Sequence, residues 1–300
     1  WDLERRYHLG KTAWQLGETD EAFLELERVV AQVPTDVRAR RILVLIHATR
    51  GQSVDLVREL EAVARLDDDD VPTKLDLAAA YVAARREIDA IRTYDAIVAR
   101  DPKQWQALKF LGDLHARAGR SDAAIGYWSR AISANPRDPR PYFVMGAAYV
   151  ARGDDVHARR LYIRAQRFAE YLGETWNNLG AISYREGKLQ ESLWYLRRAV
   201  KKSPRSVRIR YNLALSLSAS KDMDKALAEI ETGLALDSKH VGLTYLRGVA
   251  LLRKGEAGQA REAFQAVLKL DPDHADARHN LDLLDRMERR ASQGSEIIRE

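Results

Sequence analysis

Cysteine is absent from the chain of 300 residues, which excludes disulfides, thiolate metal sites and cysteine nucleophiles. Long apolar runs are absent too. None approaches the about 20 residues that a membrane-spanning helix needs, so we expect no such span in this segment. A large excess of one charge is also lacking, because 49 basic residues stand against 44 acidic ones and the formal charge is +5. We therefore expect most charges to lie on solvated helix faces, many in pairs four residues apart.

Motifs that carry catalysis are missing as well. The sequence has no glycine-rich phosphate loop, no nucleophile elbow and no HExxH. Ser218 and Lys221 match the spacing S-x-x-K without its partner motifs, and we interpret them as a chance match. His240 and His274 occupy equivalent turns, which leaves a surface metal site open, although two exposed loop histidines are the simpler interpretation. We predict a non-enzymatic segment with no cofactor, no metal and no small-molecule substrate.

The chain does contain an internal period of 34 residues. Its clearest copy, residues 105–136, is predicted to form two amphipathic helices around a Gly-Arg-Ser turn, closed by Pro136. The position of Gly112 is occupied by a small residue in seven of eight copies, the other copies having Gly10, Val44, Ala78, Gly146, Gly180, Ala214 and Gly248. A periodic helix–turn–helix of this length predicts a solenoid, in which each copy packs only against its neighbours.

The small residues have a physical reason. We expect Gly112 to lie where the first helix of its copy crosses the second at Ala124, because helices approach closely only where the side chains are small. The large residue four positions later, Trp128, is expected to fill the space between neighbouring helices, a burial that contributes about 2–3 kcal/mol.

The turns between the helices also follow a pattern. Glycine ends the first helix in six copies because it accepts the left-handed backbone conformation, whereas Arg85 and Lys221 take its place in the other two. Ser53 and Ser121 are predicted to cap the second helix of their copies.

Two segments depart from the period. Asp67 to Asp70 lack the pattern of a calcium loop, so we expect a solvated loop that also caps the helix starting near Pro72. Residues 167–172 lack a closing proline and are expected to extend the second helix of the fifth copy.

These positions resemble those of a known family. The large residues four after the alanine (Tyr94, Trp128, Tyr162, Phe264) and the segment Trp176-Asn177-Asn178-Leu179-Gly180, closed by Pro204, are similar to tetratricopeptide repeats. The resemblance implies an all-α fold, a right-handed superhelical solenoid. The expected copies are 3–36, 37–70, 71–104, 105–138, 139–172, 173–206, 207–240 and 241–274, followed by a capping helix at 275–290 and a flexible tail at 291–300.

The resemblance also implies that the first helix of every copy lines a concave groove. The facing positions in the fourth copy are those of Gln106, Lys109, Asp113, Ala116 and Arg117. Across eight copies they hold nine basic residues and three acidic ones, and several aromatic residues. Arginine with tyrosine is typical of binding hot spots. The candidate partner-binding residues are Lys109, Arg117, Arg140, Phe143, Asn177, Asn178, Tyr184, Arg185, Arg208, Tyr211, Asn212, Tyr245 and Arg253.

Asparagines refine this hypothesis. Asn178 and Asn212 are equivalent in consecutive copies, and Asn280 recurs in the capping helix. A carboxamide both donates and accepts, so such a ladder suits an extended peptide backbone. We predict a protein–protein scaffold or adaptor, within a multiprotein assembly, that holds an extended or helical, acidic segment of a partner protein in a basic, aromatic groove.

Two alternatives stay open. One is a helical-repeat RNA-binding protein, which the acidic residues in the groove disfavour. The other is the regulatory arm of a longer enzyme. The chain begins at Trp1 without a methionine, and residues 1–10 do not resemble a signal peptide. We therefore expect sequence upstream of Trp1, which could include a signal or anchor, and the compartment stays open.

Overall fold

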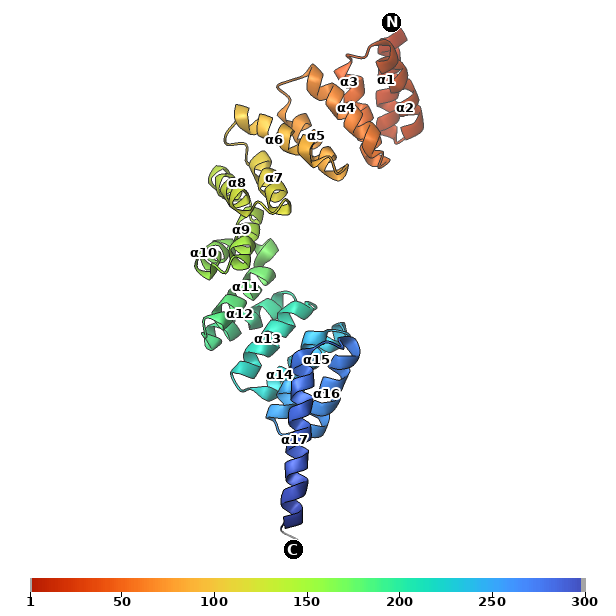
Figure 1. Ribbon diagram of the computed structural model, residues 1–300. Helices are drawn as coiled ribbons and strands as arrows, with labels where there is room; N and C mark the ends of the chain where they lie inside the picture. Colours follow the sequence, from red (N-terminus) through yellow and green to blue (C-terminus); the bar gives the residue numbers. More distant parts are fainter. Residues whose placement is uncertain (1, 298–300) are drawn as a thin grey trace. The chain divides into compact units, whose positions relative to one another are not determined.

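The computed structural model describes residues 2–297, without the side chains of residues 170 and 290–297. Every regular element in this part of the chain is a helix, as predicted from the sequence (Figure 1). None of the described helices is both long and apolar enough to cross a membrane. The chain divides into two compact units, Trp1–Pro141 and Tyr142–Glu300, which we call the first unit and the second unit.

The helices follow one another in antiparallel pairs. The first unit contains α1 (Asp2–Leu16), α2 (Thr19–Gln32), α3 (Val37–Thr49), α4 (Ser53–Leu66), α5 (Val71–Ala83), α6 (Glu87–Arg100), α7 (Trp105–Arg117) and α8 (Ser121–Ala134), and α9 (Arg140–Ala151) begins at its end. The second unit continues with α10 (Asp155–Ala165), the 3-10 helix η1 (Ala169–Tyr171), α11 (Leu172–Arg185), α12 (Leu189–Lys202), α13 (Val207–Ala219), α14 (Met223–Leu236), α15 (Val241–Arg253), α16 (Ala257–Leu270) and α17 (Ala275–Ile297). From α1 to α8 in the first unit and from α10 to α17 in the second, each helix packs chiefly on the next, as predicted for a helical solenoid.

Within each pair, the first helix approaches the second at its small residue. A Cβ atom added to Gly112 would lie 2.4 Å from the indole of Trp128, sixteen residues later. The same interval joins Gly146 to Tyr162 and Gly248 to Phe264. The glycine therefore contacts the large residue of the second helix. The sequence pattern had predicted that it would contact the alanine that comes four positions before that large residue. That alanine, Ala124 in the fourth copy, is fully buried beside the crossing.

The turns adopt the backbone conformation that the glycines indicate. All six turn glycines have positive φ, between 67° and 83°. Arg85 and Lys221 adopt the same conformation with φ of 59° and 63°. Because their Cβ atoms oppose it, these two turns are strained.

Several local expectations are wrong. Ser53 and Ser121 are the first residues of α4 and α8, and the residues before them, Gln52 and Arg120, provide no side-chain cap. In the fifth copy α10 ends at Ala165 and η1 follows, so the second helix is shorter than expected. The reason is packing: Phe168 contacts Tyr142, 5.7 Å between ring centroids, which turns the chain out of the helix.

The last helix also differs from its expected bounds. One helix, α17, covers 275–297, where the sequence indicated a helix to 290 and then a tail. Residues 298–300 of that tail lie outside the described residues.

The four aspartates form a loop that is held by cations of the chain itself. Asp70 caps α5 by accepting a hydrogen bond from the backbone N–H of Thr73 at 3.0 Å, as expected. Arg41 pairs with Asp70 at 2.7 Å, and Arg100 pairs with Asp69 at 2.7 Å. Lys74 pairs with Asp68, which lowers the pKa of that carboxyl.

A pair of glycines in the fourth copy tests the crossing. Gly112→Ala should reduce the free energy of unfolding by about 1–3 kcal/mol, because its methyl group would overlap the indole of Trp128. Gly126→Ala, on the exposed side of α8 with nothing within 4 Å, should increase it by about 0.5–1 kcal/mol through helix propensity. Urea unfolding measures both. Equal shifts in the same direction would show that the crossing does not constrain this position.

The strained turns give a second prediction. Lys221→Gly should stabilise the protein by about 0.5–1 kcal/mol, because glycine removes the cost of positive φ and only part of that gain is lost to the entropy of the unfolded chain. The reverse change, Gly187→Lys, should destabilise it by a similar amount, since its Cβ would meet no other atom and only the backbone would be strained. The melting temperature should rise in Lys221→Gly and fall in Gly187→Lys. Shifts in the same direction would show that positive φ does not strain the turn at Lys221.

Candidate partner-binding groove

Two adjoining cavities lie along the first helices of three consecutive copies in the second unit. The larger, about 260 Å³, is lined by Tyr184, Leu215, Ser218, Ala219, Tyr245, Leu246, Val249 and Arg253. The smaller, about 210 Å³, is lined by Ala181, Tyr184, Arg185, Leu196, Asn212, Leu215 and Ser216. Tyr184 and Leu215 belong to both, so the cavities meet along α11 and α13. We call this surface the groove of the second unit.

Five of the thirteen candidate residues line these cavities: Tyr184, Arg185, Asn212, Tyr245 and Arg253. The guanidinium of Arg253 donates to the carbonyl oxygen of Ser218 at 3.0 Å. The hydroxyl of Ser218 is buried and has no hydrogen-bond partner among the described residues. Sequence analysis missed Ser218 as a groove residue, although it occupies the facing position equivalent to that of Tyr184.

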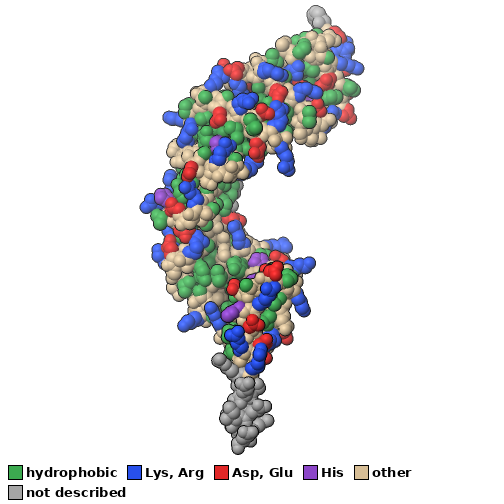
Figure 2. Space-filling view, viewed as in Figure 1, with side chains coloured by type: hydrophobic (Ala, Val, Ile, Leu, Met, Phe, Trp, Pro, Cys, Tyr) green, Lys and Arg blue, Asp and Glu red, His purple; other side chains and the backbone are tan. Residues whose placement is uncertain are grey.

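The positive charge expected of the groove is largely neutralised. Lys109 pairs with Asp138 at 3.1 Å, and Arg140 pairs with Asp113 at 2.8 Å. Arg117 and Arg38 pair with carboxylates of the preceding copy, Glu87 and Glu4, and Arg41 pairs with Asp70 at the end of its own copy. Figure 2 shows basic and acidic side chains intermixed on the visible face. The count from sequence missed partners that lie outside the facing positions, such as Asp138 and Glu87.

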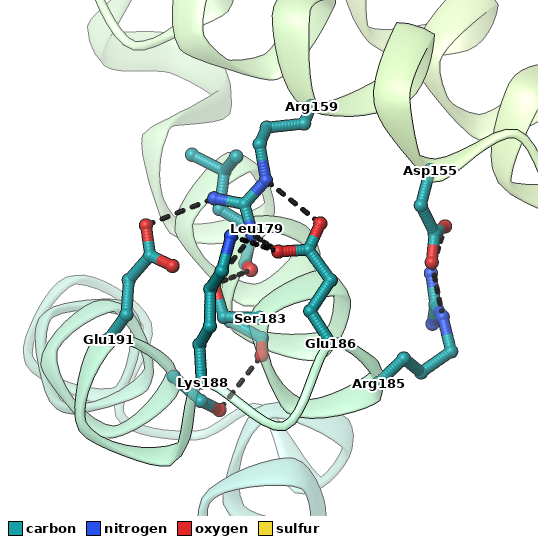
Figure 3. Close-up of polar contacts among 10 residues, drawn as sticks. Asp155, Arg159, Leu179, Ser183, Arg185, Glu186, Lys188 and Glu191 are labelled. Carbon is teal, nitrogen blue, oxygen red and sulfur yellow. Dashed lines mark hydrogen bonds and ion pairs between the residues drawn. The ribbon is translucent and has the colours of Figure 1, made fainter.

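Arg185 illustrates this neutralisation within the second unit. Its guanidinium donates two hydrogen bonds to Asp155, at 2.8 and 2.5 Å (Figure 3). The carboxylate raises the pKa of Arg185. Among the nine basic facing residues, Lys11, Arg208 and Arg253 form no ion pair with the carboxylates that the structure describes. In the second unit the positive charge that a partner would meet is therefore that of Arg208 and Arg253.

The asparagines form a network inside the protein. Asn212 donates to the side-chain oxygen of Asn177 at 2.8 Å, and Asn177 donates to that of Asn178 at 3.2 Å. Asn177 is only 2% exposed. The network joins α11 and α13, so these amides stabilise the stacking of two copies, and of the three only Asn212 lines one of the cavities.

The candidate aromatics divide into packed and open rings. Phe143 stacks on Tyr171 with 5.4 Å between centroids, and Tyr245 stacks on His274 at 4.9 Å. Tyr211 lies 5.7 Å from His240. Tyr184, in contrast, contacts no other ring in the described part of the chain. Its ring is therefore the aromatic surface most available to a partner.

The two histidines of the metal hypothesis cap helices. The Nδ1 atom of His240 accepts from the backbone N–H of Leu243 at 3.1 Å, and that of His274 accepts from Ala277 at 3.3 Å. No group of three metal-ligating side chains occurs among the described residues. A capping role accounts for both positions.

Family comparison agrees with this geometry. Family models described as tetratricopeptide repeat match residues 75–139, 111–172 and 178–241, and another with the same description matches 243–274. The chain belongs to the tetratricopeptide repeat family. The copies before residue 75 lie outside these matches. The fold of this tetratricopeptide repeat protein is that of a protein-binding scaffold, and the fold is typically non-catalytic.

Solved structures share the fold at low sequence identity. YrrB, described as a tetratricopeptide protein with an unusual peptide-binding site, is 20% identical with a TM-score of 0.55, over 62% of this chain and 96% of YrrB. A tetratricopeptide protein from Parabacteroides merdae is 16% identical with a TM-score of 0.57, over 83% and 98%. PilF of Pseudomonas aeruginosa is 13% identical with a TM-score of 0.60, over 69% and 95%. No curated protein matched the sequence.

Tyr162 gives this tetratricopeptide protein a pH dependence. Burial raises the pKa of its hydroxyl to about 12, above the about 10 of an unfolded chain. Between these values the unfolded state has lost a proton that the folded state retains, so stability falls as the pH rises from about 10 to 12, by about 2–3 kcal/mol. Tyr162→Phe should flatten the fall in urea-unfolding free energy over this range. An unchanged slope in the variant would assign the effect to other tyrosines.

Proposed function

We propose that this protein is a non-catalytic adaptor whose second unit binds a short segment of a partner protein along α11, α13 and α15. The observation that carries the proposal is the pair of adjoining cavities that share Tyr184 and Leu215. The walls combine aliphatic side chains with a tyrosine and an arginine that is not neutralised. This combination is typical of the centre of a protein-binding surface.

The size of the cavities favours a peptide. Small-molecule sites have volumes of roughly 300–1,000 Å³, and each cavity here is smaller, about 260 and 210 Å³. Each therefore suits one anchoring side chain, and two adjoining cavities suit two side chains of one segment. YrrB, with its peptide-binding site, offers a precedent within the same fold.

Arg253 selects for an acidic group in the partner. One of its N–H groups donates to the carbonyl oxygen of Ser218, and a guanidinium has five N–H donors in total. The others can donate to a carboxylate of the partner, and the hydroxyl of Ser218 lies in the same cavity. Arg208, on the N-terminal part of α13, adds charge that attracts an acidic segment.

Several other candidate residues have structural contacts instead. Asn177 accepts a hydrogen bond from Asn212 of the next copy, Asn178 accepts one from Asn177, and Phe143 stacks on Tyr171 of its own copy, so their replacement would change folding as well as binding. Lys109 and Arg117 belong to the first unit, where carboxylates pair with them. We therefore propose Tyr184 and Arg253 as the principal contacts, with Asn212 and Tyr245 beside them.

Binding of peptides selected from a random-sequence phage library tests this function. By calorimetric titration, Tyr184→Ala should weaken binding of the selected peptide by about 2 kcal/mol, because the cavity loses the aromatic wall that holds the anchoring side chain. Arg253→Gln should weaken it and reduce the salt dependence, whereas Arg185→Gln should do less, because Asp155 already neutralises that cation.

Trp194→Ala, on the opposite side of the unit, serves as the control and should leave affinity unchanged. All variants must retain the melting behaviour of the wild type. Wild-type affinity in both Tyr184→Ala and Arg253→Gln would exclude the groove as the binding surface.

A further inference from the structure

A second surface lies on the second helices α10 and α12. Side chains spaced at i, i+3, i+4 and i+7 or i+8 lie along one face of a helix. On α10 and α12 the residues of this face are exposed: Val156, Arg160, Ile163 and Arg164 on α10, and Trp194, Arg197, Arg198 and Lys201 on α12. We call these eight residues the outer stripe.

The cations of the outer stripe are not neutralised. Arg160, Arg164, Arg197, Arg198 and Lys201 form no ion pair with any carboxylate that the structure describes. Lys202 and Arg205 follow directly and form none either. This is the reverse of the groove, where most cations are paired. The equivalent face of α14 has acidic residues instead, at Asp224 and Glu231.

The carboxylates near the outer stripe pair with other cations. Arg159 of α10 donates to Glu186 at 2.8 Å and to Glu191 of α12 at 3.0 Å (Figure 3). Lys188 also pairs with Glu186, at 2.7 Å. These contacts hold α10 beside the start of α12. Because Glu186 and Glu191 are paired with Arg159 and Lys188, they do not neutralise the cations of the outer stripe.

Large apolar side chains lie among the cations. Val156 is 59% exposed, Ile163 is 49% exposed and Trp194 is 47% exposed. The guanidinium of Arg198 lies 3.6 Å from the centroid of Trp194 and so covers one face of the ring. Exposed aliphatic side chains form no hydrogen bonds with phosphates. In contrast, the interface of a lipid bilayer accepts aliphatic side chains, tryptophan and cations together.

We propose that the outer stripe attaches the second unit to an anionic lipid surface. Trp194 and Ile163 enter the interfacial layer, while Arg160, Arg197 and Lys201 lie against the headgroup charges. The groove, formed by the first helices, then stays open to a partner on the other side. This attachment is independent of what the groove binds.

Vesicle co-sedimentation tests the proposal with two lipid compositions. The protein should bind vesicles of equal parts phosphatidylcholine and phosphatidylglycerol, and not vesicles of phosphatidylcholine alone. The variant Arg197→Gln/Arg198→Gln/Lys201→Gln should lower the partition coefficient on the order of 100-fold, from the loss of three cations near the surface. The matched control, Lys103→Gln/Lys239→Gln/Lys269→Gln, makes the same change in net charge at exposed residues elsewhere and should remain within a few-fold of the wild type.

Insertion of Trp194 has its own readout. Brominated lipids in the anionic vesicles should quench part of the tryptophan fluorescence of the wild type, and Trp194→Phe should lose that part. Absence of binding to anionic vesicles would overturn the proposal, as would equal losses in the two triple variants. Binding of a single-stranded oligonucleotide that the outer-stripe variant loses, without vesicle binding, would make the stripe a nucleic-acid surface instead.

Discussion

The crossing of the two helices in each copy is the contact on which the rest of the structure depends. A small residue on the first helix admits a large residue sixteen positions later, as Gly112 admits Trp128. Because the same interval joins Gly10 to Leu26, Gly180 to Leu196 and Gly248 to Phe264, the first helices within each unit present equivalent positions on one side and the second helices on the other. Within the second unit, the groove and the outer stripe follow from that regularity. The solenoid thus turns positions 34 residues apart in sequence into neighbours on a surface.

The charge that such a surface presents to a partner depends on which of its charged side chains form ion pairs within the protein. Counted by position, the groove is basic; with the ion pairs included, most of that charge disappears, since Lys109, Arg140 and Arg185 each have a carboxylate partner. In the second unit, the facing cations without a carboxylate partner are Arg208 and Arg253, and the cations of the outer stripe on α10 and α12 have none either. The two surfaces differ in shape as well. One is hollowed by cavities and suits a peptide segment, whereas the other presents exposed side chains and suits an extended anionic surface.

The sequence predicted the helices and turns because their causes are local. A turn glycine needs no distant partner to adopt positive φ, and the period itself marked Arg85 and Lys221 as exceptions. The errors about the groove arose where a partner lies far along the chain. Asp155, which neutralises Arg185, is 30 residues away, and the amide network links Asn212 to Asn177 over 35 residues. No spacing within one copy indicates which way such side chains point. The unpaired hydroxyl of Ser218 was missed for the same reason, because its burial depends on α15, a helix of the next copy.

The central claim is that the second unit meets a partner protein through the cavities between α11, α13 and α15. Methyl NMR tests this most directly, with a peptide selected on the wild type titrated into protein labelled at leucine and valine methyl groups. The account predicts that Leu215, Leu246 and Val249 shift and saturate together, while the exposed Val54, Val156 and Leu236 on second helices do not. Shifts confined to those second-helix methyls, with Leu215 and Val249 unchanged at saturation, would contradict it.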